Sequence, residues 1–171
     1  MLTLILLRHA KAVPHGGDDF ARELTDKGHK DAGRTGAFLL VNDLLPDLAL
    51  VSPAARTRQT FEDLAVASRP IRVHYEDDLY NAGAGELRER LRHAGSKVNT
   101  LLIVGHNPGI VELALKLGRD GDIKDLEAMR ARFPPSSFAI IEFRAENWED
   151  AAASGGQLVQ FVTPDDLKAG R

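Results

Sequence analysis

The sequence contains no cysteine, which excludes disulfides, zinc–thiolate sites, iron–sulfur clusters and a cysteine nucleophile. It has no excess of positive charge either, because 22 Lys and Arg residues stand against 25 Asp and Glu residues. Nucleic-acid binding depends on cationic side chains that displace counterions, so no nucleic-acid partner is expected. Long apolar runs are also missing, since Met1–Leu7 is too short to cross a bilayer and Arg8 follows at once. We therefore expect a cytoplasmic protein with no membrane partner.

What the chain does have is the composition of an ordinary folded domain. Of its 171 residues, 43% are hydrophobic and 27% are charged, which is typical of globular proteins and unlike disordered or fibrous ones. A chain of this length can bury about 70% of its unfolded surface, which is enough for one well-packed core. We predict a single domain over residues 1–171.

Short apolar runs along the chain predict β-strands. Leu2–Leu7 is apolar at nearly every position, which is typical of a central strand buried on both faces of a parallel sheet. Similar runs predict further strands at Leu48–Val51, Ile71–His74, Leu101–Val104, Phe138–Phe143 and Leu158–Val162. The last of these strands can be antiparallel to the others.

Helix signals, such as a polar N-cap followed by proline, lie between these strands. They predict helices from Thr25 to Leu40, from Ser52-Pro53 to about Ala67, over Glu86–His93, and from Asn107-Pro108 to Gly118. The stretch Ala151–Gly156 is predicted to be a hairpin-like connection. The alternation of strands and helices predicts an α/β fold, a three-layer α/β/α sandwich with a mostly parallel central sheet.

Basic residues follow three of the predicted strands, near the point where each strand ends. Arg8 and His9 follow the first strand, Arg56 lies just after the second, and His106 follows the strand that ends at Val104. Ligands of open α/β sheets collect at this edge, and guanidiniums beside helix N-termini suit an oxyanion. Taken singly, each residue is more often a surface or capping residue. Four of them at one edge favour a binding site.

A metal ion fits this group of residues poorly. A site at His9 and His106 would need carboxylates or a third histidine at ligand spacing, and neither strand end supplies them. Arginine neighbours repel a divalent cation, whereas they attract a phosphoryl group. We therefore expect no metal and no cofactor, and we interpret a histidine as the nucleophile.

Three segments resemble the motifs of the histidine phosphatase superfamily, which includes the phosphoglycerate mutases. Leu7–Ala10 resembles its Arg-His-Gly motif, with alanine in place of the usual glycine. Ser52–Thr60 resembles its Ser-Pro-x-x-Arg-x-x-x-Thr segment, and Val104–Asn107 resembles its second-histidine motif. The short length, together with Arg22–Gly28, is most similar to the small SixA-type phosphohistidine phosphatases.

The resemblance implies a phosphoglycerate mutase-like fold and a role for each basic residue. His9 would accept the phosphoryl group, while Arg8, Arg56 and His106 would bind its oxygens. Arg22 would also reach the phosphate. These roles are physically sensible, because the transition state of phosphoryl transfer spreads negative charge over three oxygens that positioned cations stabilise.

Many members of that superfamily place an acidic proton donor after the strand that corresponds to Ile71–His74. Glu76, Asp77 and Asp78 are the candidates here, but they match no motif, and a solvated acidic turn is an equal interpretation. An alkoxide leaves poorly without an acid, whereas imidazole, whose conjugate acid has a pKa of about 6.5, leaves readily. A missing donor would therefore favour phosphohistidine as the substrate.

The sequence thus predicts a metal-independent phosphatase that works through a phosphohistidine intermediate. The expected substrate is a phosphorylated protein, such as a histidine phosphotransfer domain, because the short chain leaves no room for a large cap over a small substrate. One alternative is a small-molecule phosphomonoesterase with its acid near Glu76–Asp78. A non-catalytic phosphoprotein-binding module is another, and a mutase is the weakest enzyme alternative. Phe133–Ser137 breaks the chain before a strand and is expected to be purely structural.

Overall fold

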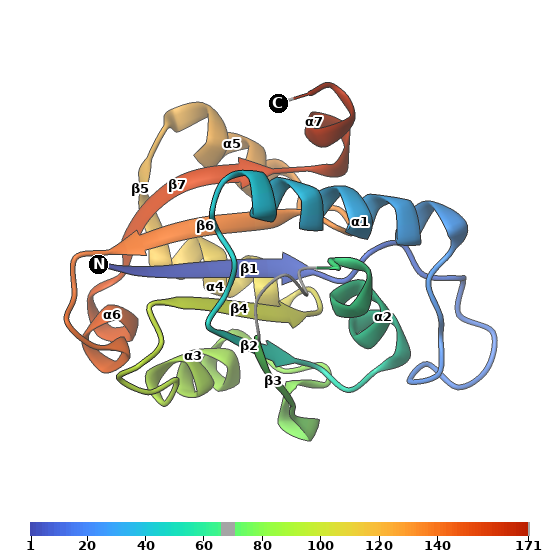
Figure 1. The fold of residues 1–171 in the computed structure, drawn as a ribbon, viewed down its shortest axis with the longest axis horizontal. Helices are drawn as coiled ribbons and strands as arrows, with labels where there is room; N and C mark the ends of the chain where they lie inside the picture. The colour runs from blue at the N-terminus through green and yellow to red at the C-terminus, as the bar shows by residue number, and fades with distance from the viewer. Residues whose placement is uncertain (66–70, 171) are drawn as a thin grey trace.

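The computed structural model describes residues 1–65 and 71–170. In these residues a seven-stranded sheet has the order β3-β2-β4-β1-β6-β7-β5 (Figure 1). Its strands are β1 (Leu2–Arg8), β2 (Leu48–Val51), β3 (Arg72–Tyr75), β4 (Thr100–Gly105), β5 (Gly118–Gly121), β6 (Phe138–Phe143) and β7 (Gly156–Val162). Strands β3, β2, β4 and β1 are parallel to one another, whereas β6 is antiparallel to both β1 and β7. The sheet is mostly parallel, as the sequence predicts.

Helices cover both faces of this sheet (Figure 1). One face carries α1 (Asp26–Val41), α2 (Ala55–Asp63) and α7 (Pro164–Lys168). The other carries α3 (Ala84–Arg92), α4 (Gly109–Leu117), α5 (Ile123–Ala131) and α6 (Trp148–Ser154), and a short 3-10 turn, η1 (Asp77–Leu79), precedes α3. The predicted three-layer sandwich is therefore confirmed. Among the described residues, no helix is long and apolar enough to cross a bilayer.

Strand β1 is apolar at almost every position because both of its faces are buried. Leu4 and Leu6 belong to the core under α3–α6, whereas Ile5 and Leu7 belong to the core under α1, α2 and α7. All four side chains are completely buried. The two cores hold β1 in the middle of the sheet, and this fixes where its last residues emerge.

The helix after β2 differs from the prediction at both ends. It begins at Ala55 rather than at Pro53, and it ends at Asp63, because the backbone at Ala65 has a positive φ of 48° that no helix can continue. The predicted end at Ala67 lies outside the described residues. Ser52 is not the N-cap, and its hydroxyl group makes a different contact, described below.

The prediction of a hairpin-like connection at Ala151–Gly156 is wrong. Helix α6 fills most of this stretch, because the Asn147 side chain caps it by accepting from the Asp150 amide and because Trp148 is buried. Gly155, at a φ of 75°, ends the helix and leads into β7. The sequence also gave no sign of β5, which extends the sheet beyond β7.

Candidate active site

The predicted site residues meet at the carboxyl ends of the parallel strands. Arg8 pairs in register with Gly105, so the chain leaves β1 and β4 at the same level of the sheet. The His9 amide donates to the Gly105 carbonyl oxygen at 3.0 Å. The Ser52 amide donates to the Val104 carbonyl oxygen at 3.1 Å, which ties the end of β2 to the same edge. In Figure 1 this edge lies at the arrowhead of β1, beside α2.

His9 has the geometry of a nucleophile. Its Nδ1 lies 2.7 Å from the carbonyl oxygen of Ala10, and because a carbonyl only accepts, Nδ1 carries the proton. The lone pair is therefore on Nε2. Burial and the nearby cations Arg56, Arg8 and Arg22 lower the pKa of His9 to about 4, so its ring is neutral at pH 7.

His106 lies beside His9, and the ring centroids are 5.4 Å apart. Its Nδ1 is 3.2 Å from Nη2 of Arg56, and since arginine only donates, Nδ1 accepts. The Nε2 proton therefore goes to the Ser52 hydroxyl oxygen, 2.7 Å away. Burial, together with Arg56 and His9, lowers the pKa of His106 to about 3. Both histidines are neutral in the free protein.

Arg8 and Arg56 bring buried donors to this edge. Nη1 of Arg8 donates to the Phe133 carbonyl oxygen at 2.9 Å, while Arg56 is only 3% exposed. The Nε atoms of both arginines are buried and have no hydrogen-bond partner within the described residues. A buried charged donor without an acceptor is costly. An oxyanion between the two guanidiniums and His9 would relieve this cost.

Arg22 reaches the same place through a residue that sequence reasoning missed, Asp19. Nη1 of Arg22 donates to Oδ1 of Asp19 at 2.8 Å, and Nη2 of Arg56 donates to Oδ2 at 3.2 Å. The Tyr80 hydroxyl group donates to Oδ2 at 2.5 Å. Hydrogen bonds from Tyr80 and Arg22 hold the pKa of Asp19 well below its ordinary value. Asp19 is therefore ionised.

Residues 133–137 lie beside the site, where their backbone atoms hold Arg8, His9 and Asn107, in keeping with the structural role that the sequence predicts. Besides accepting from Arg8, the Phe133 carbonyl oxygen accepts from Nδ2 of Asn107 at 3.0 Å. The Ser136 amide donates to the carbonyl oxygens of Arg8 and His9 at 3.2 and 3.0 Å. These are backbone contacts, so no residue type in the sequence could have signalled them.

Two of the three carboxylates considered as proton donors pair with Arg90. Oε2 of Glu76 lies 3.1 Å from Nε of Arg90, and Asp78 also pairs with Arg90. Asp77 is exposed in η1. Within the described residues, no hydrogen bond or ion pair joins any of the three to His9 or His106. The same part of the chain holds no cluster of three His, Asp or Glu residues arranged for a metal ion.

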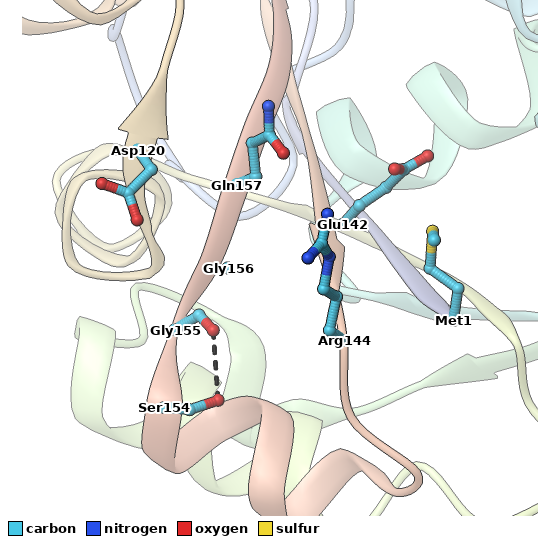
Figure 2. Close-up of a pocket in the computed structure, with 8 residues that line it drawn as sticks. All are labelled: Met1, Asp120, Glu142, Arg144, Ser154, Gly155, Gly156 and Gln157. Atoms are coloured by element: carbon cyan, nitrogen blue, oxygen red, sulfur yellow. Dashed lines mark hydrogen bonds between the residues drawn. The ribbon is translucent and has the colours of Figure 1, made fainter.

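A separate pocket lies at the other end of the sheet. Figure 2 shows its lining, which includes Met1, Asp120, Glu142 and Arg144. Met1 precedes β1, whereas His9 follows it, so this pocket and the two histidines are at opposite ends of the central strand. None of the residues expected to bind phosphate lines it.

Comparisons with known proteins agree with a phosphoryl-transfer site. A family model described as the histidine phosphatase superfamily (branch 1) matches residues 4–101. An uncharacterized protein of Mycobacterium tuberculosis, Rv1276c, is 36% identical over 163 residues, which cover 92% of this chain and 99% of that protein. The chain belongs to the histidine phosphatase superfamily.

Two solved structures are similar to this chain in both fold and sequence. A chain from Nakamurella multipartitia, named as a candidate phosphohistidine phosphatase SixA, is 30% identical with a TM-score of 0.85, covering 95% of this chain and 96% of that chain. A SixA candidate from Agrobacterium tumefaciens is 31% identical with a TM-score of 0.77, covering 95% and 98%. The fold is therefore phosphoglycerate mutase-like, and the protein is a phosphatase.

Proposed function

We propose that this phosphatase hydrolyses phosphohistidine on a protein, through a phospho-His9 intermediate and without a metal ion. The observation that carries the proposal concerns the proton donor. Glu76 and Asp78 are paired with Arg90, and Asp19, the carboxylate beside the site, is ionised and held by two arginines and Tyr80. A site without a protonated carboxyl group suits a substrate whose leaving group is imidazole.

The geometry supports a two-step reaction. Nε2 of His9 attacks phosphorus, the P–N bond of the substrate breaks, and its electron pair returns to the leaving imidazole nitrogen, which takes a proton from water and leaves hydroxide. Water then attacks phospho-His9, the P–Nε2 bond breaks and its electron pair returns to Nε2, which restores the neutral ring. The proton that the attacking water loses neutralises the hydroxide, and inorganic phosphate is released. Arg8 and Arg56 would bind the equatorial oxygens as charge develops. His106 would join them as the protonated ring, once Nη2 of Arg56 leaves Nδ1 of His106 for the phosphoryl group. The hydrogen bond from Nδ1 to Ala10 keeps Nε2 free for both steps.

The similarity to two SixA candidates at 30 and 31% identity supports the same substrate class. We further propose that the phosphate is presented by a signalling or phosphotransfer protein, of which a histidine phosphotransfer domain is the simplest form. The absence of a three-residue cluster of His, Asp or Glu in the described residues supports a metal-free reaction, because the donor set for a divalent cation is not there.

A turnover assay in the presence of EDTA tests this proposal. It compares a phosphohistidine peptide, p-nitrophenyl phosphate and a simple alkyl phosphate for the native protein, for His9→Ala and for His93→Ala, whose imidazole is exposed and lies against Glu89. We expect a strong preference for phosphohistidine, no turnover by His9→Ala, and native rates for His93→Ala. Unchanged turnover by His9→Ala would rule out the intermediate. Phosphate binding without turnover of any substrate would favour a non-catalytic binding module instead.

A further inference from the structure

The side chain of Asp19 pairs with two of the cations that are expected to bind phosphate, Arg22 and Arg56. Its two carboxylate oxygens accept from Arg22, Arg56 and Tyr80 at 2.8, 3.2 and 2.5 Å. Nδ1 of His15 lies 3.8 Å from Oδ1. A carboxylate and one edge of a phosphoryl group both offer two oxygen acceptors to a guanidinium. Asp19 thus acts as an anion already present at the site.

Hydrogen bonds engage both terminal nitrogens of Arg56 and two of the three nitrogens of Arg22. Nη1 of Arg56 donates to the main-chain oxygen of Asp19 at 2.7 Å, and Nη2 is shared between Asp19 and His106. Nε of Arg22 donates to the Val13 carbonyl oxygen at 3.0 Å. A phosphoryl oxygen that is to be bound by Arg22 or by the terminal nitrogens of Arg56 must therefore compete with Asp19.

The loop that carries Asp19 can accommodate such an exchange. Residues 14–18 are exposed, and a Cβ atom added at Gly16 or Gly17 would meet no atom within 4 Å. The Asp19 side chain is itself 31% exposed, so a modest turn of the loop would bring it into solvent at the mouth of the site. The carboxylate would then stand beside the bound phosphate and keep its negative charge.

We propose that Asp19 determines which phosphorylated substrates the site accepts. Its carboxylate pairs with Arg22 and Arg56 in the free protein, and the phosphoryl group of the substrate replaces it on both arginines. The displaced carboxylate then repels substrates that carry a second anionic group next to the phosphate. Like charges brought together across a binding site are an effective means of rejecting a wrong ligand. This inference rests on the proposed function, since a neutral or cationic imidazole leaving group is the kind that Asp19 would admit.

The first test measures binding of inorganic phosphate by calorimetry. If Asp19 competes with phosphate, only the molecules in which Asp19 has released the arginines can bind it. The apparent Kd is then the intrinsic Kd divided by the fraction of such molecules. For Asp19→Asn, which keeps the shape and removes the charge, we expect the Kd for phosphate to fall about tenfold. Asp120→Asn makes the same change of net charge at the far pocket of Figure 2 and should leave the Kd unchanged. An unchanged or higher Kd for Asp19→Asn would overturn the inference, the higher value meaning that Asp19 only positions the arginines.

The second test measures selectivity with two aryl phosphates that differ in charge, p-nitrophenyl phosphate and 4-carboxyphenyl phosphate. We expect Asp19→Asn to raise kcat/KM for the carboxylated substrate about tenfold relative to the nitro substrate. Tyr80→Phe removes one hydrogen bond from Asp19 but keeps its charge, so it should tighten phosphate binding without changing the ratio of the two rates. An unchanged ratio in Asp19→Asn would contradict a role in selectivity.

These outcomes separate the inference from the proposed function. Tighter phosphate binding by Asp19→Asn, combined with no turnover of phosphohistidine, would uphold the exchange and overturn the substrate assignment. Turnover of phosphohistidine, combined with an unchanged Kd for phosphate in Asp19→Asn, would uphold the substrate assignment and overturn the exchange. If the native protein bound no phosphate and hydrolysed none of the substrates, both proposals would be wrong.

Discussion

The hydroxyl oxygen of Ser52 lies 2.7 Å from Nε2 of His106, and both residues are buried. This contact fixes which nitrogen of His106 carries the proton, because the other nitrogen accepts from Arg56. Ser52 is therefore a positioning residue for the second histidine, although its place before a proline made it look like a helix cap.

We predict that Ser52→Ala lowers kcat for a phosphohistidine peptide about tenfold, because the buried Nε2–H loses its acceptor and the ring is free to turn. Nitrogen NMR of His106 should show a loss of the Nε2–H tautomer in the same variant. Ser154→Ala removes an exposed hydroxyl group from α6 and serves as the control. A native kcat together with a native tautomer in Ser52→Ala would show that the contact is not needed.

The low pKa values of the two histidines predict how stability changes with pH. An unfolded histidine takes up a proton near pH 6.5, whereas folded His9 and His106 do so only near pH 4 and 3. Their contribution is fully present above about pH 6.5, and the free energy of unfolding should fall below it by up to ~1.4 kcal/mol per pH unit for each residue. Urea denaturation between pH 7.5 and 4.5, chosen to span about this range, measures the slope. His9→Gln should show a shallower slope, and an identical slope would contradict the assignment to His9.

Two glycines of α1 offer a matched pair of packing variants. A Cβ added at Gly36 would lie 1.8 Å from the carbonyl oxygen of Leu64, where α1 packs on the end of α2. We predict that Gly36→Ala destabilises the protein by at least ~2 kcal/mol despite the better helix propensity of alanine. Gly33→Ala meets only the Asp63 carbonyl oxygen, at 3.9 Å, and should stabilise by about 0.5–1 kcal/mol. Thermal unfolding of both variants tests the contrast, which would fail if the two changed the Tm in the same direction.

The ion pair between Glu76 and Arg90 predicts that Glu76 takes no part in proton transfer. Glu76→Gln should change kcat/KM for the phosphohistidine peptide by less than about twofold, whereas loss of a true general acid costs about a hundredfold or more. The alkyl phosphate assay is the sensitive control, since its leaving group needs an acid. A selective collapse of alkyl phosphate turnover in this variant would identify the protein as a phosphomonoesterase that uses Glu76.

The sequence predicts the central sheet and the gathering of the basic residues well because both depend on the most buried strands. β1 and β4 are covered on both faces, so their apolar runs are continuous and their ends are easy to locate. Arg8 is the last residue of β1, and His9 and His106 directly follow β1 and β4. Parallel strands bring their carboxyl ends to one edge. At these two strands, the local sequence pattern is therefore enough to predict where the site residues lie.

Other features depend on contacts that no local pattern records. Asp19 and Tyr80 are 61 residues apart and meet only because their two loops converge on Arg56. Helix α6 looks like a connection because its alanines lead into a pair of glycines, yet Trp148 anchors it by donating from Nε1 to the Val98 carbonyl oxygen at 2.8 Å. Long-range packing overrides weak local preference in both places.

The hydrogen bonds from residues 133–137 to the end of β1 have a consequence for the chain while it is being synthesised. Every motif residue lies in the first 107 positions, but Arg8 and His9 are held in place by Phe133, Ser136 and Ser137, and β1 gains its second neighbour only when β6 pairs with it. A chain still growing on the ribosome therefore carries all of its candidate catalytic side chains before it can orient them. We expect activity to begin late in synthesis, and a fragment released early to hold the motifs without the chemistry.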